Sequence, residues 1–157
     1  MENLERYKHL NKYLKDKFGE RTLKICIDGG FSCPNRDGSI SNSGCIFCSE
    51  RGSGDHIKLQ YISNQVKNYF TSYKAERATK FIAYFQNFTN TYDSIENLKM
   101  KYDAALIDDR IVALAIATRP DCISEDVCKL LKSYSEKYYV WVELGLQTSN
   151  EHTGKII

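Results

Sequence analysis

Four short apolar segments alternate with stretches of helical periodicity, and this order most constrains the fold of the chain. β-Branched and aromatic residues are frequent in the segments, as is typical of strands. Strands separated by helices usually pair in parallel, so the sequence predicts an α/β fold built as a parallel βα repeat. The expected strands are residues 23–27, 80–86, 111–117 and 138–146.

Helical patterns fill the intervals, because apolar residues recur there at three- and four-residue steps. We expect a capping box from Asp93 and Glu96 at the start of one helix and an N-cap from Ser124 at the start of the next. Tyr73 is expected on the apolar face of the helix that follows the first strand. The expected helices between strands are residues 60–78, 93–106 and 124–134.

A further amphipathic helix is expected before the first strand, at residues 3–18, and Gly19 would end it. Its apolar face comprises Leu4, Tyr7, Leu10, Leu14 and Phe18. The chain is therefore expected to consist of an N-terminal helical extension, residues 1–22, and a core domain, residues 23–157.

Three of the six cysteines lie in one loop directly after the first expected strand. Cys33, Cys45 and Cys48 have the spacing C-x11-C-x2-C within residues 28–48. Two intervening residues let a pair of thiolates converge on one metal centre. Parallel sheets carry their chemistry at the carboxyl ends of the strands, where this loop begins. The loop is therefore the predicted metal site.

Two kinds of metal centre fit these cysteines. Structural zinc takes four protein ligands, and His56 is the nearest candidate for the fourth. A 4Fe-4S cluster on three cysteines instead leaves one iron open to a small molecule. Phe47, directly before the last cysteine, favours a cofactor with a flat ring such as adenine.

In these residues the chain resembles the radical S-adenosylmethionine (radical SAM) superfamily, in which three cysteines hold such a cluster. Its spacing departs from the commonest one, C-x3-C-x2-C, and is similar to that of the uncharacterised YhcC-like branch, with GFSCPNRDG followed by GCIFC. That branch is similar to the elongator-type and methylthiotransferase groups that modify tRNA. The resemblance continues through FIAYFQNFTNTY, ATRPD and WVELGLQT and covers nearly the whole chain.

The resemblance implies two cofactors, a 4Fe-4S cluster and S-adenosylmethionine (SAM). The three cysteines would ligate the cluster, its open iron would bind the amino and carboxylate groups of SAM, and Phe47 would lie near the adenine. An external electron donor such as a flavodoxin or ferredoxin would drive cleavage of SAM to a 5'-deoxyadenosyl radical. The other expected SAM contacts are Gln86, Asn90, Glu143 and Gln147.

Structural interpretations of these polar residues stay open. The segment with Gln86 and Asn90 replaces the Gly-Gly-Glu stretch of many radical SAM proteins and also suits a simple polar turn. Glu143 interrupts an apolar strand that we expect to be buried on both faces, where a carboxylate is costly without a partner. It therefore contacts the cofactor or forms an ion pair. Arg119 suits a carboxylate, a phosphate or a turn that Pro120 fixes.

Composition is consistent with a soluble protein of the cytoplasm. The net charge of +2 is too small to indicate nucleic-acid binding by itself, and no apolar run approaches the roughly 18 residues of a membrane span. Thiols stay reduced in the cytoplasm, so Cys26, Cys122 and Cys128 are expected as buried thiols and not as disulfides.

The resemblance also implies a partial TIM-type barrel of six βα units, of which this chain would hold the first four strands. Residues 150–157 would then begin the next helix of a longer enzyme. The alternatives are an inactive fragment and the zinc module with His56. The substrate is unknown, and similarity to tRNA-modifying groups leaves RNA as a hypothesis.

Overall fold

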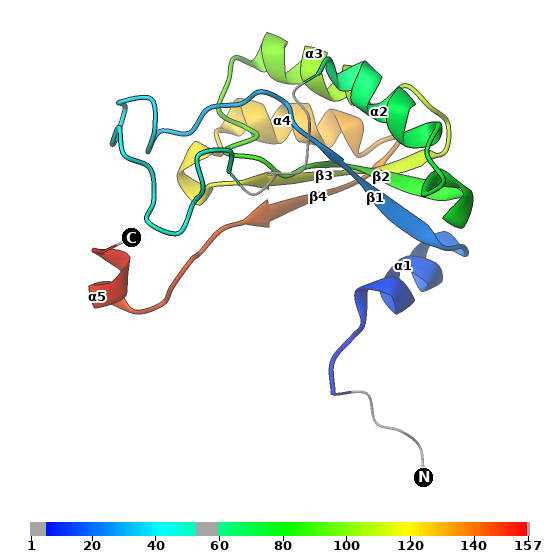
Figure 1. Ribbon diagram of the computed structural model, residues 1–157, viewed down its shortest axis with the longest axis horizontal. Coiled ribbons are helices and arrows are strands. Elements are labelled where there is room, and N and C mark those ends of the chain that lie inside the picture. The colour runs from blue at the N-terminus through cyan, green and yellow to red at the C-terminus, as the bar shows by residue number, and fades with distance from the viewer. Residues whose placement is uncertain (1–5, 53–59, 157) are drawn as a thin grey trace.

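The computed structural model describes residues 6–52 and 60–156, and within these ranges four strands form one parallel sheet. The strand order β1-β2-β3-β4 follows the chain, as expected for successive βα units (Figure 1). The α/β fold with a parallel βα repeat is therefore confirmed. The strands are β1 (Thr22–Ile27), β2 (Lys80–Phe85), β3 (Ile111–Thr118) and β4 (Tyr139–Leu144).

One face of the sheet is covered by α2 (Ile62–Phe70), α3 (Ile95–Ala105) and α4 (Glu125–Tyr134) (Figure 1). Alternate residues of the strands point into this layer, as the two-residue period of a strand requires. The principal core cluster includes the strand residues Ile25, Ile27, Phe81, Ala83, Phe85, Leu114 and Ile116 and the helix residues Val66, Leu98, Tyr102, Val127, Leu130, Leu131 and Tyr134.

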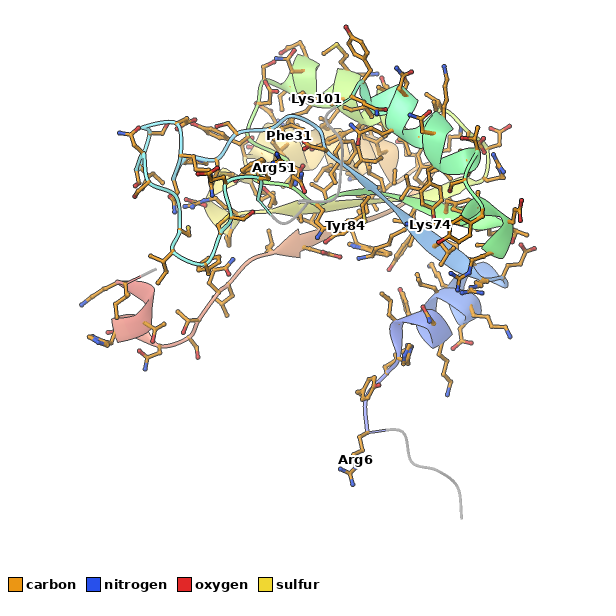
Figure 2. All side chains as sticks on the ribbon, viewed as in Figure 1. Arg6, Phe31, Arg51, Lys74, Tyr84 and Lys101 are labelled. Carbon is orange, nitrogen blue, oxygen red and sulfur yellow. The ribbon has the colours of Figure 1, made fainter. Side chains whose placement is uncertain are left out.

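The opposite face is covered only in part, by α1 (Leu10–Phe18). Leu14 of α1 packs in a second cluster with Ile82, Ala113 and Ala115. Farther along this face, half-exposed polar and aromatic side chains replace apolar ones, and Tyr84 lies there beneath the sheet in Figure 2. No helix of the described residues covers this part of the face, which leads to the carboxyl ends of the strands.

Three of the expected helix boundaries are wrong. The N-terminal helix begins at Leu10, because the His9 side chain accepts a hydrogen bond from the backbone of Asn11 and caps it. Tyr7 precedes this helix and is 71% exposed, while Leu4 lies outside the described residues. The third helix is capped by Ser94, and not by Asp93, which instead accepts from the side chain of Asn97.

The second helix ends at Phe70, eight residues earlier than expected. The hydroxyl groups of Thr71 and Ser72 donate to backbone carbonyls of the last turn and compete with its continuation. A separate 3₁₀ turn, Ala75–Arg77, follows, and Tyr73 is exposed.

The fourth strand is the exposed edge of the described sheet, and not a strand buried on both faces. Leu144 is 54% exposed, and β4 ends there, before Leu146. The predicted terminal helix is one short turn, α5 (Glu151–Gly154). The expected cap at Ser124 is confirmed, since its side chain accepts from the backbone of Val127.

Two further findings bear on the chemistry of the chain. Cys26 and Cys128 are exposed and Cys122 is half-buried, so the expectation of three buried thiols was wrong. The apolar residues around each cysteine in the sequence do not determine whether its own side chain points into the core or toward the solvent. Within the described residues, no helix is long and apolar enough to cross a membrane.

Candidate functional site

A cavity of about 650 Å³ lies where the strands end, between the cysteine loop and the segment that follows β4. In Figure 1 this loop, blue to cyan, and α5, red, extend beyond the same end of the sheet. The cavity wall brings together most of the residues predicted from the sequence, namely Cys33, Cys45, Cys48, Phe47, Gln86, Glu143 and Gln147.

The cysteine loop is fixed at its base to the helical layer. Asp28 accepts a hydrogen bond from Asn87 at 2.9 Å, and its backbone exchanges two hydrogen bonds with the side chain of Gln65. Phe31 is buried next to Gly29, where a Cβ atom would lie 2.3 Å from the Phe31 ring. The start of the loop is therefore rigidly placed.

Lys101 of α3 also contacts the start of the cysteine loop, through the ring of Phe31. Its ammonium lies 3.9 Å from the centre of the Phe31 ring and 2.9 Å from a carboxylate oxygen of Asp93 (Figure 2). A cation over an aromatic face is attractive, and the ion pair keeps the cation in place.

The cysteine side chains line one cavity but do not close on a common point. The backbone of Cys48 donates to the carbonyl of Cys45 at 3.0 Å, which forms the turn of the C-x2-C pair. The side chain of Asn35 donates to the Cys45 sulfur at 3.0 Å. Among the described residues, no three His, Cys, Asp or Glu side chains are grouped closely enough to hold one metal ion. His56, the proposed zinc ligand, lies outside the described ranges.

Phe47 is 54% exposed and forms part of the cavity wall next to Cys48. An exposed aromatic ring leaves its face available to a planar ligand. The prediction that it packs an adenine stays a prediction.

The segment after β2 separates two of the predicted SAM contacts. Gln86 lines the cavity, whereas Asn90 is fully buried and is not part of the cavity wall. The side-chain nitrogen of Asn90 donates to the carbonyl of Ala117 at 2.7 Å. The backbone carbonyl of Asn90 accepts from the Tyr102 hydroxyl at 2.6 Å. Asn90 thus holds this segment on the end of β3.

Two residues in the cavity wall have strained backbone conformations. Phe88 (φ 59°) and Gln147 (φ 65°) are in the left-handed region, which disfavours residues with a Cβ atom. Phe88 follows β2 and Gln147 follows β4, so the strain is concentrated where the sheet meets the cavity.

Glu143 enters the cavity wall from β4 and is held by described side chains of three strands. It accepts from Tyr84 at 2.6 Å, from Lys24 at 3.1 Å and from Trp141 at 3.1 Å. Burial opposes ionisation, but these hydrogen bonds outweigh it and lower the pKa of the Glu143 carboxyl. Burial and the bond to Glu143 raise the pKa of Tyr84. Glu143 is therefore a fixed anion, and the predicted ion pair exists with Lys24.

The Glu143 cluster makes stability depend on pH. Its lowered folded-state pKa adds stability above the ordinary glutamate pKa of about 4.3, and this contribution is lost as the pH falls through the folded value. We expect Glu143→Gln to melt at a lower temperature than the wild type near neutral pH, and the difference to vanish in acid. Thermal unfolding followed by circular dichroism at several pH values measures this.

The matched control for the Glu143 test is Glu136→Gln, which changes an exposed carboxylate in the same way. We expect it to melt like the wild type at each pH. A melting difference for Glu143→Gln that stays constant from neutral to acid pH would contradict the role assigned to the anion.

Arg119 also lines the cavity, at the end of β3. Its guanidinium donates to both carboxylate oxygens of Asp121, at 2.9 and 2.7 Å. This hydrogen bonding lowers the pKa of Asp121 and raises that of Arg119. The predicted carboxylate partner of Arg119 is thus a residue of its own turn.

Sequence reasoning missed Lys24 and Tyr84 as partners of Glu143, and Arg36 as part of the cavity wall. The two partners lie on β1 and β2, neither of which pairs with β4 in the sheet, so no local pattern in the sequence indicates these contacts. Arg36 lies between the first two cysteines of the loop, but its residue type alone gave no signal.

The chain is similar along most of its length to curated proteins. The uncharacterized protein YtqA of Bacillus subtilis is 42% identical over 98% of this chain and 48% of its own length. The protein YhcC of Escherichia coli K12 is 38% identical over 89% of this chain and 45% of its own. The uncharacterized protein MJ0486 of Methanocaldococcus jannaschii is 36% identical over 92% of this chain and 45% of its own.

These matches limit what similarity can establish. The chain spans about half the length of the curated relatives it matches. No family model matches the chain, and no solved structure matches it. The function must therefore be argued from the residues of the cavity.

Proposed function

We propose that this chain is the N-terminal, cofactor-binding part of a radical SAM enzyme. One observation carries the proposal: three cysteines and Phe47 share a cavity with Glu143 at the carboxyl ends of a parallel sheet. Ligands of open α/β sheets bind at this edge. The relation to the superfamily and its YhcC-like branch rests on the sequence resemblance.

The donor set of the cavity fits an iron–sulfur cluster. Thiolates are the ligands that such clusters take, and the loop offers three free cysteines. Three thiolates would leave one of the four irons without a protein ligand. Binding would require Cys33, Cys45 and Cys48 to turn toward one point. Bound there, a reduced 4Fe-4S cluster would supply the electron that splits SAM into methionine and a 5'-deoxyadenosyl radical.

The residues of the chain would bind and orient the cofactors. Phe47 would pack on the adenine, and Gln86 and Gln147 would hydrogen-bond the polar groups of SAM. Glu143, already fixed by Lys24, would accept from a SAM hydroxyl or ammonium without further ordering. Asn90 would act through its hold on the segment that carries Gln86.

The proposal extends to the setting of the enzyme. A low-potential donor such as a flavodoxin or ferredoxin would supply the electron, in the cytoplasm, where thiols stay reduced. RNA is the substrate class we would test first, because the resembling groups modify tRNA. A salt-sensitive tRNA-binding assay on the whole enzyme tests it, and absence of binding would exclude it.

Anaerobic reconstitution of the wild-type chain tests the proposed function. After incubation with iron and sulfide and removal of the excess, we expect about four irons and four sulfides per chain and a broad visible absorbance. Addition of SAM should perturb the electron paramagnetic resonance spectrum of the reduced cluster, because SAM would bind the open iron.

Zinc must be measured in the same samples. One zinc per chain without sulfide would reject the cluster and favour the zinc module with His56. Absence of iron, sulfide and zinc alike would favour an inactive fragment.

A further inference from the structure

The eleven-residue spacer between Cys33 and Cys45 closes on itself. The backbone of Gly44 donates to the carbonyl of Asn35 at 2.8 Å. The carbonyl of Pro34 accepts from the backbone of Ile40 at 2.8 Å. Residues 36–43 therefore leave the loop and return to the same place, and we call them the excursion.

The closure shortens the effective distance between the first two cysteines. Across the Asn35–Gly44 hydrogen bond, only Pro34, Asn35 and Gly44 separate Cys33 from Cys45. Three intervening residues are far fewer than the sequence spacing of eleven. The side chain of Asn35 reinforces this path, because it donates to the Cys45 sulfur at 3.0 Å.

Arg36, the first residue of the excursion, reaches across to the C-x2-C turn. Its Nη2 atom donates to the carbonyls of Cys48 at 3.1 Å and Ser49 at 2.5 Å, and Nη1 donates to that of Glu50 at 3.3 Å. The Ser49 carbonyl also accepts from the backbone of Gly52 at 3.0 Å. A planar guanidinium with five donors can bind several carbonyls at once.

Gly44 and Phe88 shape the space around this guanidinium. A Cβ atom at Gly44, whose φ is +74°, would lie 3.1 Å from the Nε atom of Arg36. On another side, the Arg36 guanidinium carbon lies 5.5 Å from the centre of the Phe88 ring. The guanidinium thus lies between Gly44, at the end of the spacer, and Phe88, in the segment after β2.

We infer that Arg36 is a positioning residue that clamps the Cys45–Cys48 turn to the segment after Cys33, so that the three thiols are held on one cavity wall, from which they can turn toward a common ligand. The inference rests on the proposed function only for the identity of the metal centre. The arrangement of the three thiols can be tested independently, with any reagent that binds three thiols.

Arsenite is a suitable probe, because one As(III) replaces its three hydroxyl groups by three thiolates and releases three waters without a redox change. The reduced, metal-free chain is titrated with arsenite, and binding is followed by ultraviolet absorbance and by intact mass. We compare the wild type with Arg36→Gln, Arg36→Lys and Arg51→Gln. Arg51 is the matched control, an exposed arginine three residues after Cys48 (Figure 2).

We expect the wild type and Arg51→Gln to bind one arsenic per chain and Arg36→Gln to bind about tenfold more weakly, equivalent to about 1.4 kcal/mol. Arg36→Lys should be nearly as weak as Arg36→Gln, because a compact ammonium cannot replace the fork. Melting temperatures should stay close to that of the wild type, since Arg36 belongs to neither core cluster.

Equal arsenite affinity of Arg36→Gln and the wild type would overturn the inference, as would full affinity of Arg36→Lys or a wild type that binds no arsenite. The two proposals fail separately. If the wild type takes up no iron and sulfide but Arg36→Gln still weakens arsenite binding, the cofactor assignment is wrong and the clamp stands.

Discussion

Replacing Cys45 and Cys48 together by alanine is expected to reduce bound iron and sulfide from about four of each per chain to background. Both sulfurs lie in the wall of the same cavity, and the turn between them is closed by a backbone hydrogen bond of 3.0 Å. Alanine offers no ligand, and Cys33 alone cannot retain a cluster. Iron and sulfide analysis of anaerobically reconstituted protein measures the loss.

Cys128→Ala is the matched control for this experiment. Cys128 lies exposed on α4, away from the residues of the cavity wall. This variant removes a thiol that is more exposed than those of Cys45 and Cys48 and lies outside the cavity wall, so we expect wild-type iron and sulfide. Retention of iron by the double variant, or equal loss in the control, would show that the metal binds elsewhere or without specificity.

Replacing Tyr102 by alanine is expected to lower the free energy of unfolding by about 3–5 kcal/mol. Tyr102 is fully buried in α3, with its ring 5.3 Å from that of Phe85 and 5.9 Å from that of Tyr134. Its loss would leave a cavity between the sheet and two helices. Natural domains are stable by only about 5–15 kcal/mol, so the effect is large. Urea unfolding measures it.

Two companion variants separate the causes of the Tyr102 effect. Tyr102→Phe keeps the ring but removes the hydrogen bond to the Asn90 carbonyl, and we expect a cost of about 1–3 kcal/mol. Tyr73→Ala removes an exposed tyrosine and should change stability by less than about 0.5 kcal/mol. A Tyr102→Ala cost no larger than that of Tyr102→Phe would contradict the packing role.

The fold could be predicted because its signals are local. The four strands are apolar runs, and each begins and ends within two residues of its expected bounds, because turns and polar residues flank it. The cap at Ser124 could be predicted for the same reason, since the capping side chain bonds a backbone group three residues later.

The remaining features depend on neighbours that are distant in the sequence. The donors to Glu143 come partly from β1 and β2, neither of which pairs with β4 in the sheet. The side chain of Asn90 donates to the carbonyl of Ala117 on β3, a contact that the sequence around Asn90 does not indicate. The cavity residues were found from their types, whereas the hydrogen bonds that fix them were not.

The closed spacer between Cys33 and Cys45 also bears on how the chain tolerates change in length. A loop that returns to its starting point can grow or shrink at its tip without moving its base, and doubling its length costs only about 0.6 kcal/mol. Insertions between residues 37 and 43 should therefore leave the three sulfurs where they are, provided that Asn35 and Gly44 still meet. A pattern search that fixes the count between the first two cysteines would overlook such sequences, although their ligand geometry would be unchanged.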